Sequence, residues 1–215
     1  MLAGLAAAPA GAATHSNATP ILDPNSNVIG AQPLSPYPSA ISVSGEQGTV
    51  VKARVTLADV NGAEETDLDV FLAGPGGSTV LMSDICSTGG ILPSFIHVNF
   101  TFDDDAAAPL PQSCNPGGPG TATYKPTNYD TSDDFPGIAP PYPLGLANVR
   151  GTGPNGSWSL YAVDDSYPDP VTINGGWTLD LTTTGSPTTP KRKCKKHKRR
   201  SSSSAKKKRC KKKRR

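Results

Sequence analysis

Short runs in which apolar and polar residues alternate recur along this chain, and no stretch has the spacing of an amphipathic helix. Glycine and proline, which disfavour helices, make up 44 of the 215 residues and separate the runs. Seven or eight such runs, at intervals of ten to twenty residues, are typical of short antiparallel strands. We therefore predict an all-β fold, an antiparallel jelly-roll β-sandwich.

The alternation also predicts which side chains face the core. Three runs place the following residues inward: Val51, Ala53, Val55 and Leu57; Leu68, Val70 and Leu72; Ile96, Val98, Phe100 and Phe102. The same pattern puts Asp69 and Phe71 on an outward face and makes residues 146–151 a strand. Residues 106–145, rich in proline and glycine, are expected to be long connections with one short strand near Tyr124.

The only two tryptophans, Trp158 and Trp177, open the last two alternating runs, with acidic residues between them. Trp158 falls on the same side of its run as Leu160, and Trp177 on the same side as Leu179. Both rings are therefore predicted to face one core, where a side chain of this size buries roughly 150 to 250 Å². The competing interpretation, an aromatic platform for a ligand, is less favoured because large aromatic side chains are mostly buried.

Lysine and arginine are strongly segregated along the chain. Residues 191–215 hold 17 of the 21 basic residues and no acidic one, whereas residues 1–190 carry all 18 acidic residues and a net charge of −14. So dense a charge run cannot form a core and is expected to be disordered. Its predicted polyanion-binding residues are Lys191, Arg192, Lys193, Lys195, Lys196, Lys198, Arg199, Arg200, Lys206, Lys207, Lys208, Arg209, Lys211, Lys212, Lys213, Arg214 and Arg215.

This basic tail is expected to bind polyanions through counterion release. Nucleic acid is disfavoured as the partner, since the tail has no interleaved aromatic residues on which bases would stack. An anionic cell-envelope polymer or an anionic lipid surface fits an exported protein better. A contact between the tail and the acidic body is the remaining alternative.

The N-terminal residues favour export. A run of small apolar residues ends in Ala10-Gly11-Ala12, the A-x-A pattern of signal peptidase sites, although the basic segment that usually precedes it is missing. We predict a short signal peptide over residues 1–13; a disordered alanine-rich end is the alternative. No other stretch approaches the ~18 apolar residues that a membrane span requires. The expected location is secreted or attached to the surface of a bacterial cell.

The four cysteines form two regional pairs. In an exported protein Cys86 and Cys114 are expected to form a disulfide. By closing the loop between them it would stabilise the fold by about 3 to 4 kcal/mol. Cys194 and Cys210 lie in the tail, where they could pair with each other or tether another molecule. A zinc site is disfavoured because no C-x-x-C spacing occurs and the chain has three histidines.

Aspartates recur at the predicted strand ends, where segments distant in sequence meet. Hard cations prefer several such oxygen ligands, and the acidic charge of the body favours a bound divalent ion. A calcium site is thus one interpretation; turn capping and solvated strand ends are the other, since no continuous EF-hand loop is present. The candidate metal ligands are Asp67, Asp69, Asp84, Asp103, Asp104, Asp164, Asp165 and Asp169.

The closing residues carry a resemblance to a known family. The pattern G-x-W-x-L…D-D…I-x-G-G-W-x-L, which runs from Gly156 to Leu179, resembles the end of the P domain (P/Homo B domain) of subtilisin-like proprotein convertases, in its bacterial secreted form. Blocks at 36–45, 67–84 and 102–107 are similar in order, and the resemblance spans about residues 30–184. One departure is DVNGAEETDL, which lacks the histidine that many members carry before the hairpin.

The resemblance implies a jelly-roll sandwich of the galactose-binding-like type. In convertases this domain stabilises a subtilisin-type catalytic domain. We expect a signal peptide (1–13), an irregular lead-in (14–35), the sandwich (36–184), a Thr/Pro linker (185–190) and the tail (191–215). The predicted function is that of a non-catalytic binding or stabilising module that its tail attaches to polyanions. The alternative is an accessory domain of a subtilisin-like serine endopeptidase whose catalytic domain is on another chain.

Catalysis by this chain itself is not expected. A serine-protease triad needs a base beside its nucleophile. The body offers only His15, beside the signal-like segment, and His97, on an outward strand face with no nucleophile motif near it. We therefore predict no catalytic residue.

Overall fold

The computed structural model describes residues 11–24, 31–62, 68–87, 95–114, 120–165 and 170–184. Several predictions fall outside these ranges. They concern Asp67 and Asp169, the linker, the whole basic tail with Cys194 and Cys210, and the first ten residues of the predicted signal peptide.

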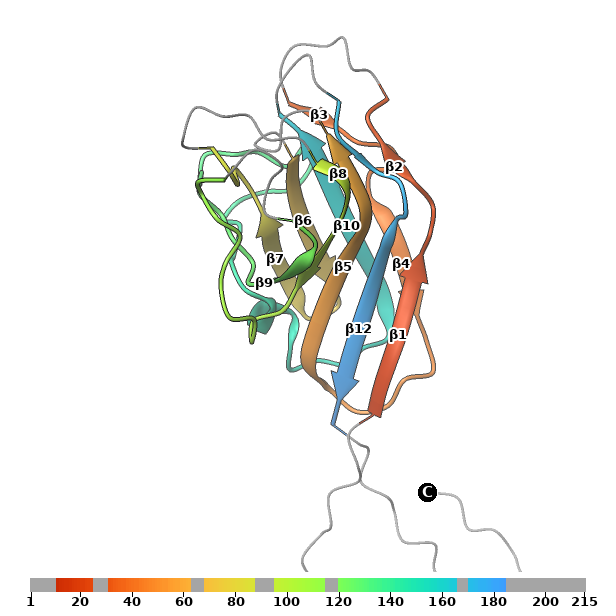
Figure 1. Cartoon of the computed structure of the whole chain (residues 1–215). Helices are drawn as coiled ribbons and strands as arrows, with labels where there is room; N and C mark the ends of the chain where they lie inside the picture. The colour runs from red at the N-terminus through yellow and green to blue at the C-terminus, as the bar shows by residue number, and fades with distance from the viewer. Residues whose placement is uncertain are drawn as a thin grey trace, which may run out of the picture.

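Strands dominate the described residues, as the alternating sequence predicts (Figure 1). In chain order the elements are β1 (Gly11–Asn17), β2 (Ile21–Leu22), β3 (Gln32–Pro33), β4 (Ser39–Val43), β5 (Val50–Gly62), β6 (Leu68–Gly74), β7 (Gly77–Met82), β8 (Phe95–Phe102), β9 (Ala122–Tyr124), the 3-10 helix η2 (Leu146–Val149), β10 (Gly156–Asp164), β11 (Thr172–Ile173) and β12 (Trp177–Thr183). The short strand β9 confirms the one expected near Tyr124, whereas 146–149 form a helical turn in place of the expected strand.

Two sheets face each other across the core. In the seven-stranded sheet, β5 is central: β12 and then β1 lie on one side, β8 and then β9 on the other, and β11 and β2 continue from its far end. In the five-stranded sheet, β3 and β4 pair with β10, followed by β6 and β7. Neighbouring strands are antiparallel except β8 and β9. The all-β sandwich is confirmed; the finer jelly-roll assignment stays a prediction.

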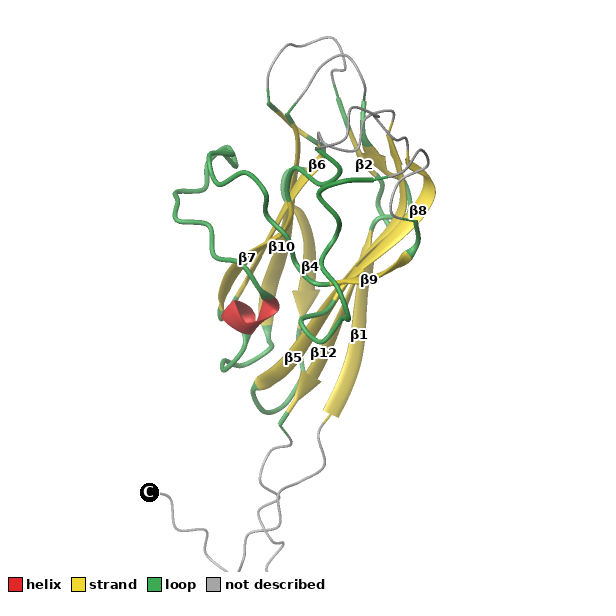
Figure 2. Cartoon of the chain, turned by 60° about the vertical axis from the view of Figure 1, so that its left-hand side comes forward, coloured by secondary structure: helices red, strands yellow, loops and turns green. Residues whose placement is uncertain are grey.

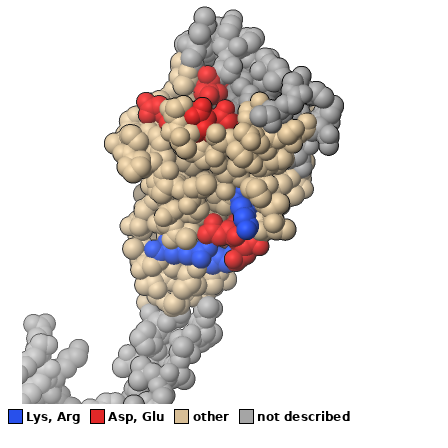
Figure 3. All heavy atoms as spheres, turned by 90° about the vertical axis from the view of Figure 1, so that its left-hand side faces the viewer, with Lys and Arg blue, Asp and Glu red and all other residues tan. Residues whose placement is uncertain are grey.

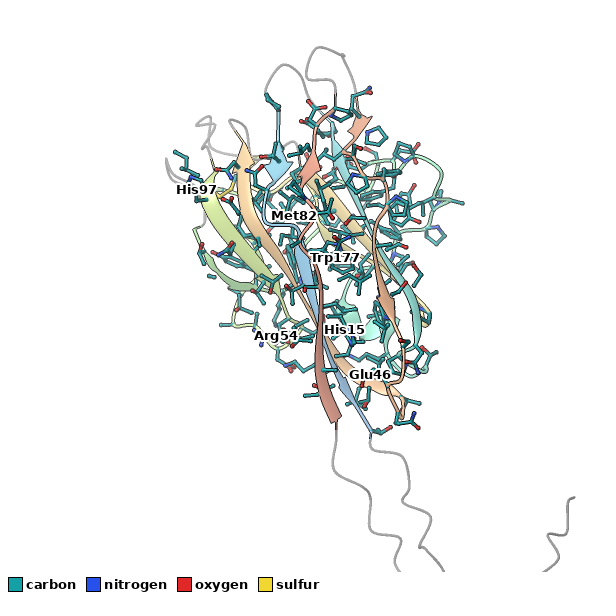
Figure 4. All side chains as sticks on the ribbon, turned by 90° about the vertical axis from the view of Figure 1, so that its right-hand side faces the viewer. His15, Glu46, Arg54, Met82, His97 and Trp177 are labelled. Atoms are coloured by element: carbon teal, nitrogen blue, oxygen red, sulfur yellow. A yellow bond between two sulfur atoms is a disulfide. The ribbon has the colours of Figure 1, made fainter. Side chains whose placement is uncertain are left out.

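Both tryptophans anchor this core, as predicted. Trp158 on β10 and Trp177 on β12 come from opposite sheets and are 0% and 1% exposed. The indole of Trp177, which lies between the sheets in Figure 4, donates from Nε1 to the Ser39 hydroxyl at 3.0 Å. The indole of Trp158 donates to the Pro154 carbonyl at 2.9 Å, so neither buried polar group is left unpaired.

Two of the predicted core residues are wrong, and each error lies at a β-bulge. Val51 is 42% exposed because the β5–β12 register shifts beside it, which turns Val50 inward instead. Ile96 is 71% exposed because the β5–β8 register is irregular there, with His97 at φ 55°. A bulge adds one residue to a strand and so reverses the faces beyond it.

The outer face of the five-stranded sheet is covered. Asp69 and Phe71 point to this face, as the alternation predicts, yet both are buried, at 2% exposed each. The long loop between β9 and η2 runs over this side of the molecule (Figure 2). Its Phe135 ring lies 5.2 Å from that of Phe71, measured between centroids.

Covalent and terminal features complete the fold. Cys86 and Cys114 form the predicted disulfide. Gly11 pairs with Thr183, so the first and last described strands end side by side (Figure 1). β1 begins inside the predicted signal peptide and continues into the predicted irregular lead-in. No described helix is long and apolar enough to cross a membrane.

Candidate metal centre

Three aspartates from three separate segments meet at one end of the five-stranded sheet. Asp69 lies on β6, Asp84 lies two residues after the end of β7, and Asp133 belongs to the loop that covers the outer face. One carboxylate oxygen from each lies within 4.8 Å of those from the other two. Figure 3 shows acidic side chains gathered, without Lys or Arg among them, near the top of the face that it presents.

Asp69 is the most unusual member of the cluster. It is 2% exposed, and its Oδ1 has no hydrogen-bond partner among the described residues. A buried carboxylate oxygen without a partner is costly, and native structures rarely retain one without a reason. Asp84 and Asp133 are half-buried, so the cluster opens to solvent on one side.

The hydroxyl of Ser83 lies inside the cluster. It is within hydrogen-bonding distance of the carboxylates of Asp84, at 3.2 Å, and Asp133, and it also lowers the pKa of Asp69 by hydrogen bonding. A hydroxyl has one proton to donate, so it cannot satisfy three carboxylates. A proton or a cation shared between the carboxylates would satisfy the oxygens that Ser83 leaves without a donor.

The electrostatics point the same way. Burial, reinforced by the charges of Asp133, Asp165 and Asp84, raises the pKa of Asp69 to about 9. Burial and the charge of Asp84 raise the pKa of Asp133 to about 6, against the opposing hydrogen bond from Ser83. None of the ion pairs between described residues includes Asp69, Asp84 or Asp133.

Backbone geometry holds Asp84 toward the cluster. Asp84 has φ 49° and Cys86 has φ 59°, both in the left-handed region that residues other than glycine seldom adopt. The disulfide to Cys114 and a hydrogen bond from the Cys86 amide to the Pro111 carbonyl, at 3.0 Å, tie this turn down. Such conformations persist only where the surroundings enforce them.

Other predicted ligands do not join the cluster. Asp103 contacts Lys52 and Arg54 at 3.0 and 3.1 Å. Asp104 pairs with Arg150 at 2.7 Å and accepts the Leu146 amide. These two aspartates already have cationic partners, and Figure 3 shows a second group in which acidic and basic side chains mix.

The aspartates between the tryptophans divide between two roles. Asp164 is 3% exposed and accepts the Val171 amide at 3.1 Å, which is a structural contact. The charge of Asp165 helps to raise the pKa of Asp69, so Asp165 belongs to the surroundings of the cluster.

Asp133 was not predicted from the sequence, because its segment has no periodicity that would place it. Its only signal was the acidic pair Asp133-Asp134 beside Phe135.

The histidines lie elsewhere. His97 lies near the start of β8; its side chain is 75% exposed, and its Nδ1 lies 2.5 Å from Oδ1 of Asp59 (Figure 4). His15 on β1 lies 3.6 Å from Glu46.

Neither the models of known protein families nor the curated proteins include a match to this chain. The P-domain resemblance therefore stays a prediction.

Proposed function

We propose that this chain is a non-catalytic β-sandwich module of the P-domain, jelly-roll type, which binds a calcium ion between Asp69, Asp84 and Asp133. The unpartnered, buried Oδ1 of Asp69 beside two further carboxylates carries the proposal. A divalent cation would satisfy that oxygen and remove the repulsion between the three groups. Calcium suits the site because the three groups contribute only hard oxygen donors and calcium tolerates irregular geometry.

Calcium is expected to stabilise the full chain against heat. At calcium concentrations about 100 times the Kd, binding adds about 2.7 kcal/mol. For a body of this size that raises Tm by roughly 5 to 10 °C. Differential scanning calorimetry in calcium and in EDTA measures the shift.

Two matched variants test whether the shift comes from this cluster. Asp133→Asn removes one ligand and should abolish most of it. Asp134→Asn makes the same charge change at the adjacent residue, whose carboxylate accepts a hydrogen bond from the Tyr142 hydroxyl at 2.8 Å. This variant should retain the Tm shift. An unchanged Tm in EDTA, or equal shifts in both variants, rejects the site.

The proposed role of the basic tail is to hold this module at an anionic surface. The tail follows β12, whose end lies beside the start of β1. The acidic cluster at the start of β6 lies at the other end of the sandwich and would face away from such a surface (Figure 3). The 17 positive charges of the tail support the attachment.

The full chain is expected to sediment with vesicles that contain anionic lipid at low salt, and a chain ending at residue 187 to stay in the supernatant. Phosphate contacts through many cations weaken steeply with salt, so raising NaCl from 50 to 200 mM should lower the affinity by about 10³ or more. Equal binding by the two chains would assign the attachment to the sandwich.

A further inference from the structure

An apolar cluster on the outer face of the five-stranded sheet depends on one loop for its cover. Its buried members are Phe71, Val80, Phe135 and Val163, with Tyr37, Tyr142 and Tyr161 at its margin. Phe71 and Val163 come from the sheet, whereas Phe135 and Tyr142 come from residues 130–143, which we call the strap. Of the four buried members, three lie on sheet strands and one, Phe135, lies on the strap.

The strap is tied to the sheet by its two ends. Before it, the Tyr129 amide donates to the Ser83 carbonyl at 3.3 Å; at its end, the Pro143 carbonyl accepts the Val80 amide at 2.8 Å. Between these two ends, the Ile138 amide donates to the Phe135 carbonyl at 2.9 Å. Both residues belong to the strap, so this backbone hydrogen bond does not tie it to the sheet. Segments with few backbone bonds to the fold open at low cost in free energy. The middle of the strap therefore relies on side chains.

Phe135 and Asp133 are two of the side chains that hold it. Phe135 is 1% exposed, with ring centroids 5.2 Å from Phe71 and 5.1 Å from Tyr142. Two residues earlier, Asp133 reaches Ser83, Asp69 and Asp84. Whatever acts on the Asp133 carboxylate therefore acts on the position of the Phe135 ring.

The three aspartates of the acidic cluster differ in how firmly the fold holds them. Asp69 lies near the start of β6, an inner strand of the sheet between β10 and β7, and is paired there with Val163 of β10. Asp84 lies in the turn that the Cys86–Cys114 disulfide fixes. Asp133, on the strap, is the member free to move away. Repulsion between the carboxylates is therefore relieved by movement of the strap.

We propose that the cation is a clamp: calcium between Asp69, Asp84 and Asp133 holds the strap closed over Phe71, and its removal lets the strap open more often and transiently expose an aromatic surface. This inference rests on the proposed calcium site. A cation bridging the three groups replaces a repulsion between strap and sheet by attraction to a common ion. The difference between the ion's affinities for the closed and the open state sets how far it shifts the equilibrium.

Hydrogen exchange followed by mass spectrometry tests the clamp in the full, oxidised chain at one pH. We expect peptides within 131–142 to exchange at least tenfold faster in EDTA than in calcium. Peptides from β5 and β12, on the other sheet, should change less than twofold. Binding of a hydrophobic dye should rise in EDTA in parallel, because the outer face becomes exposed.

Asp133→Asn separates the clamp from general stabilisation. The neutral amide no longer repels Asp84, so the strap should stay protected in EDTA, and calcium should change its exchange less than twofold. Asp134→Asn keeps all three ligands and should behave like the unaltered chain. Faster exchange of the Asp133→Asn strap in both conditions would overturn the repulsion argument.

Calorimetric titration of the full chain with calcium distinguishes the two proposals. If calcium does not bind, the proposed site and the clamp fail together. If calcium binds but protects all peptides evenly, or leaves 131–142 unchanged, the site stands and the clamp is wrong. Binding with local protection of the strap supports both.

Discussion

Replacing Trp158 by alanine is expected to lower the free energy of unfolding by about 3 to 5 kcal/mol. The side chain is fully buried, and its ring packs so closely on Gly74 that a Cβ atom there would lie 2.6 Å from it. Truncation leaves a cavity that the two sheets cannot close, and it leaves the Pro154 carbonyl without the indole donor. Urea unfolding followed by the fluorescence of Trp177 measures the loss.

Gly74→Ala provides the matched control. In the unaltered chain its methyl group clashes with the Trp158 ring, at a cost of about 1 to 3 kcal/mol. In the Trp158→Ala background the clash disappears, so the two effects should not add. Strict additivity, or a loss below about 1 kcal/mol for Trp158→Ala, would contradict the packing described above.

The interior of the sandwich was predictable because alternation reports the side of a strand directly. Leu68, Val70 and Leu72 face the core as predicted, and so do both tryptophans. The method failed at Val51 and Ile96, where a bulge inserts a residue. A bulge depends on how two strands pair, and that pairing leaves no mark on the period of either strand.

The loop that covers the outer face of the five-stranded sheet could not be predicted either. The alternation placed Asp69 and Phe71 on the correct side of β6 but gave no sign that a loop about sixty residues later would bury them. A segment without periodicity, such as the strap, carries no directional signal. Its position follows from tertiary contacts such as that between Phe135 and Phe71.

The candidate site was predicted in part for a similar reason. Asp69 and Asp84 were foreseen as strand-end carboxylates, but the sequence could not show which acidic groups would find cations. Residues 1–190 contain four Lys and Arg residues, and three of these, Lys52, Arg54 and Arg150, pair with Asp103, Asp104 and Asp105. The Asp69 cluster is therefore left without a basic partner among the described residues.

That shortage of counterions predicts an unusual pH dependence. In EDTA, the free energy of unfolding is expected to fall by about 4 kcal/mol from pH 5 to pH 8. Burial raises the pKa of Asp69 to about 9 in the folded chain, whereas the unfolded aspartate titrates at 3.8. Between these values the folded state holds a proton that the unfolded state has lost, so stability decreases as pH rises, by about 1.4 kcal/mol per unit. Asp133, with a pKa of about 6, adds to the fall at the acidic end.

Urea unfolding at several pH values measures this slope, and three comparisons assign it. Asp69→Asn carries no titrating group and should flatten the profile. Saturating calcium should do the same or reverse it, since the ion binds the deprotonated carboxylates and is favoured as pH rises. The lowered pKa values of Asp59 and Asp105 act only below about pH 4, where protonation removes their stabilising contacts with His97 and Lys52. A flat or rising profile in EDTA between pH 5 and pH 8 would mean that Asp69 is ionised in the folded chain, and its buried oxygen would then need a partner other than a proton or a cation.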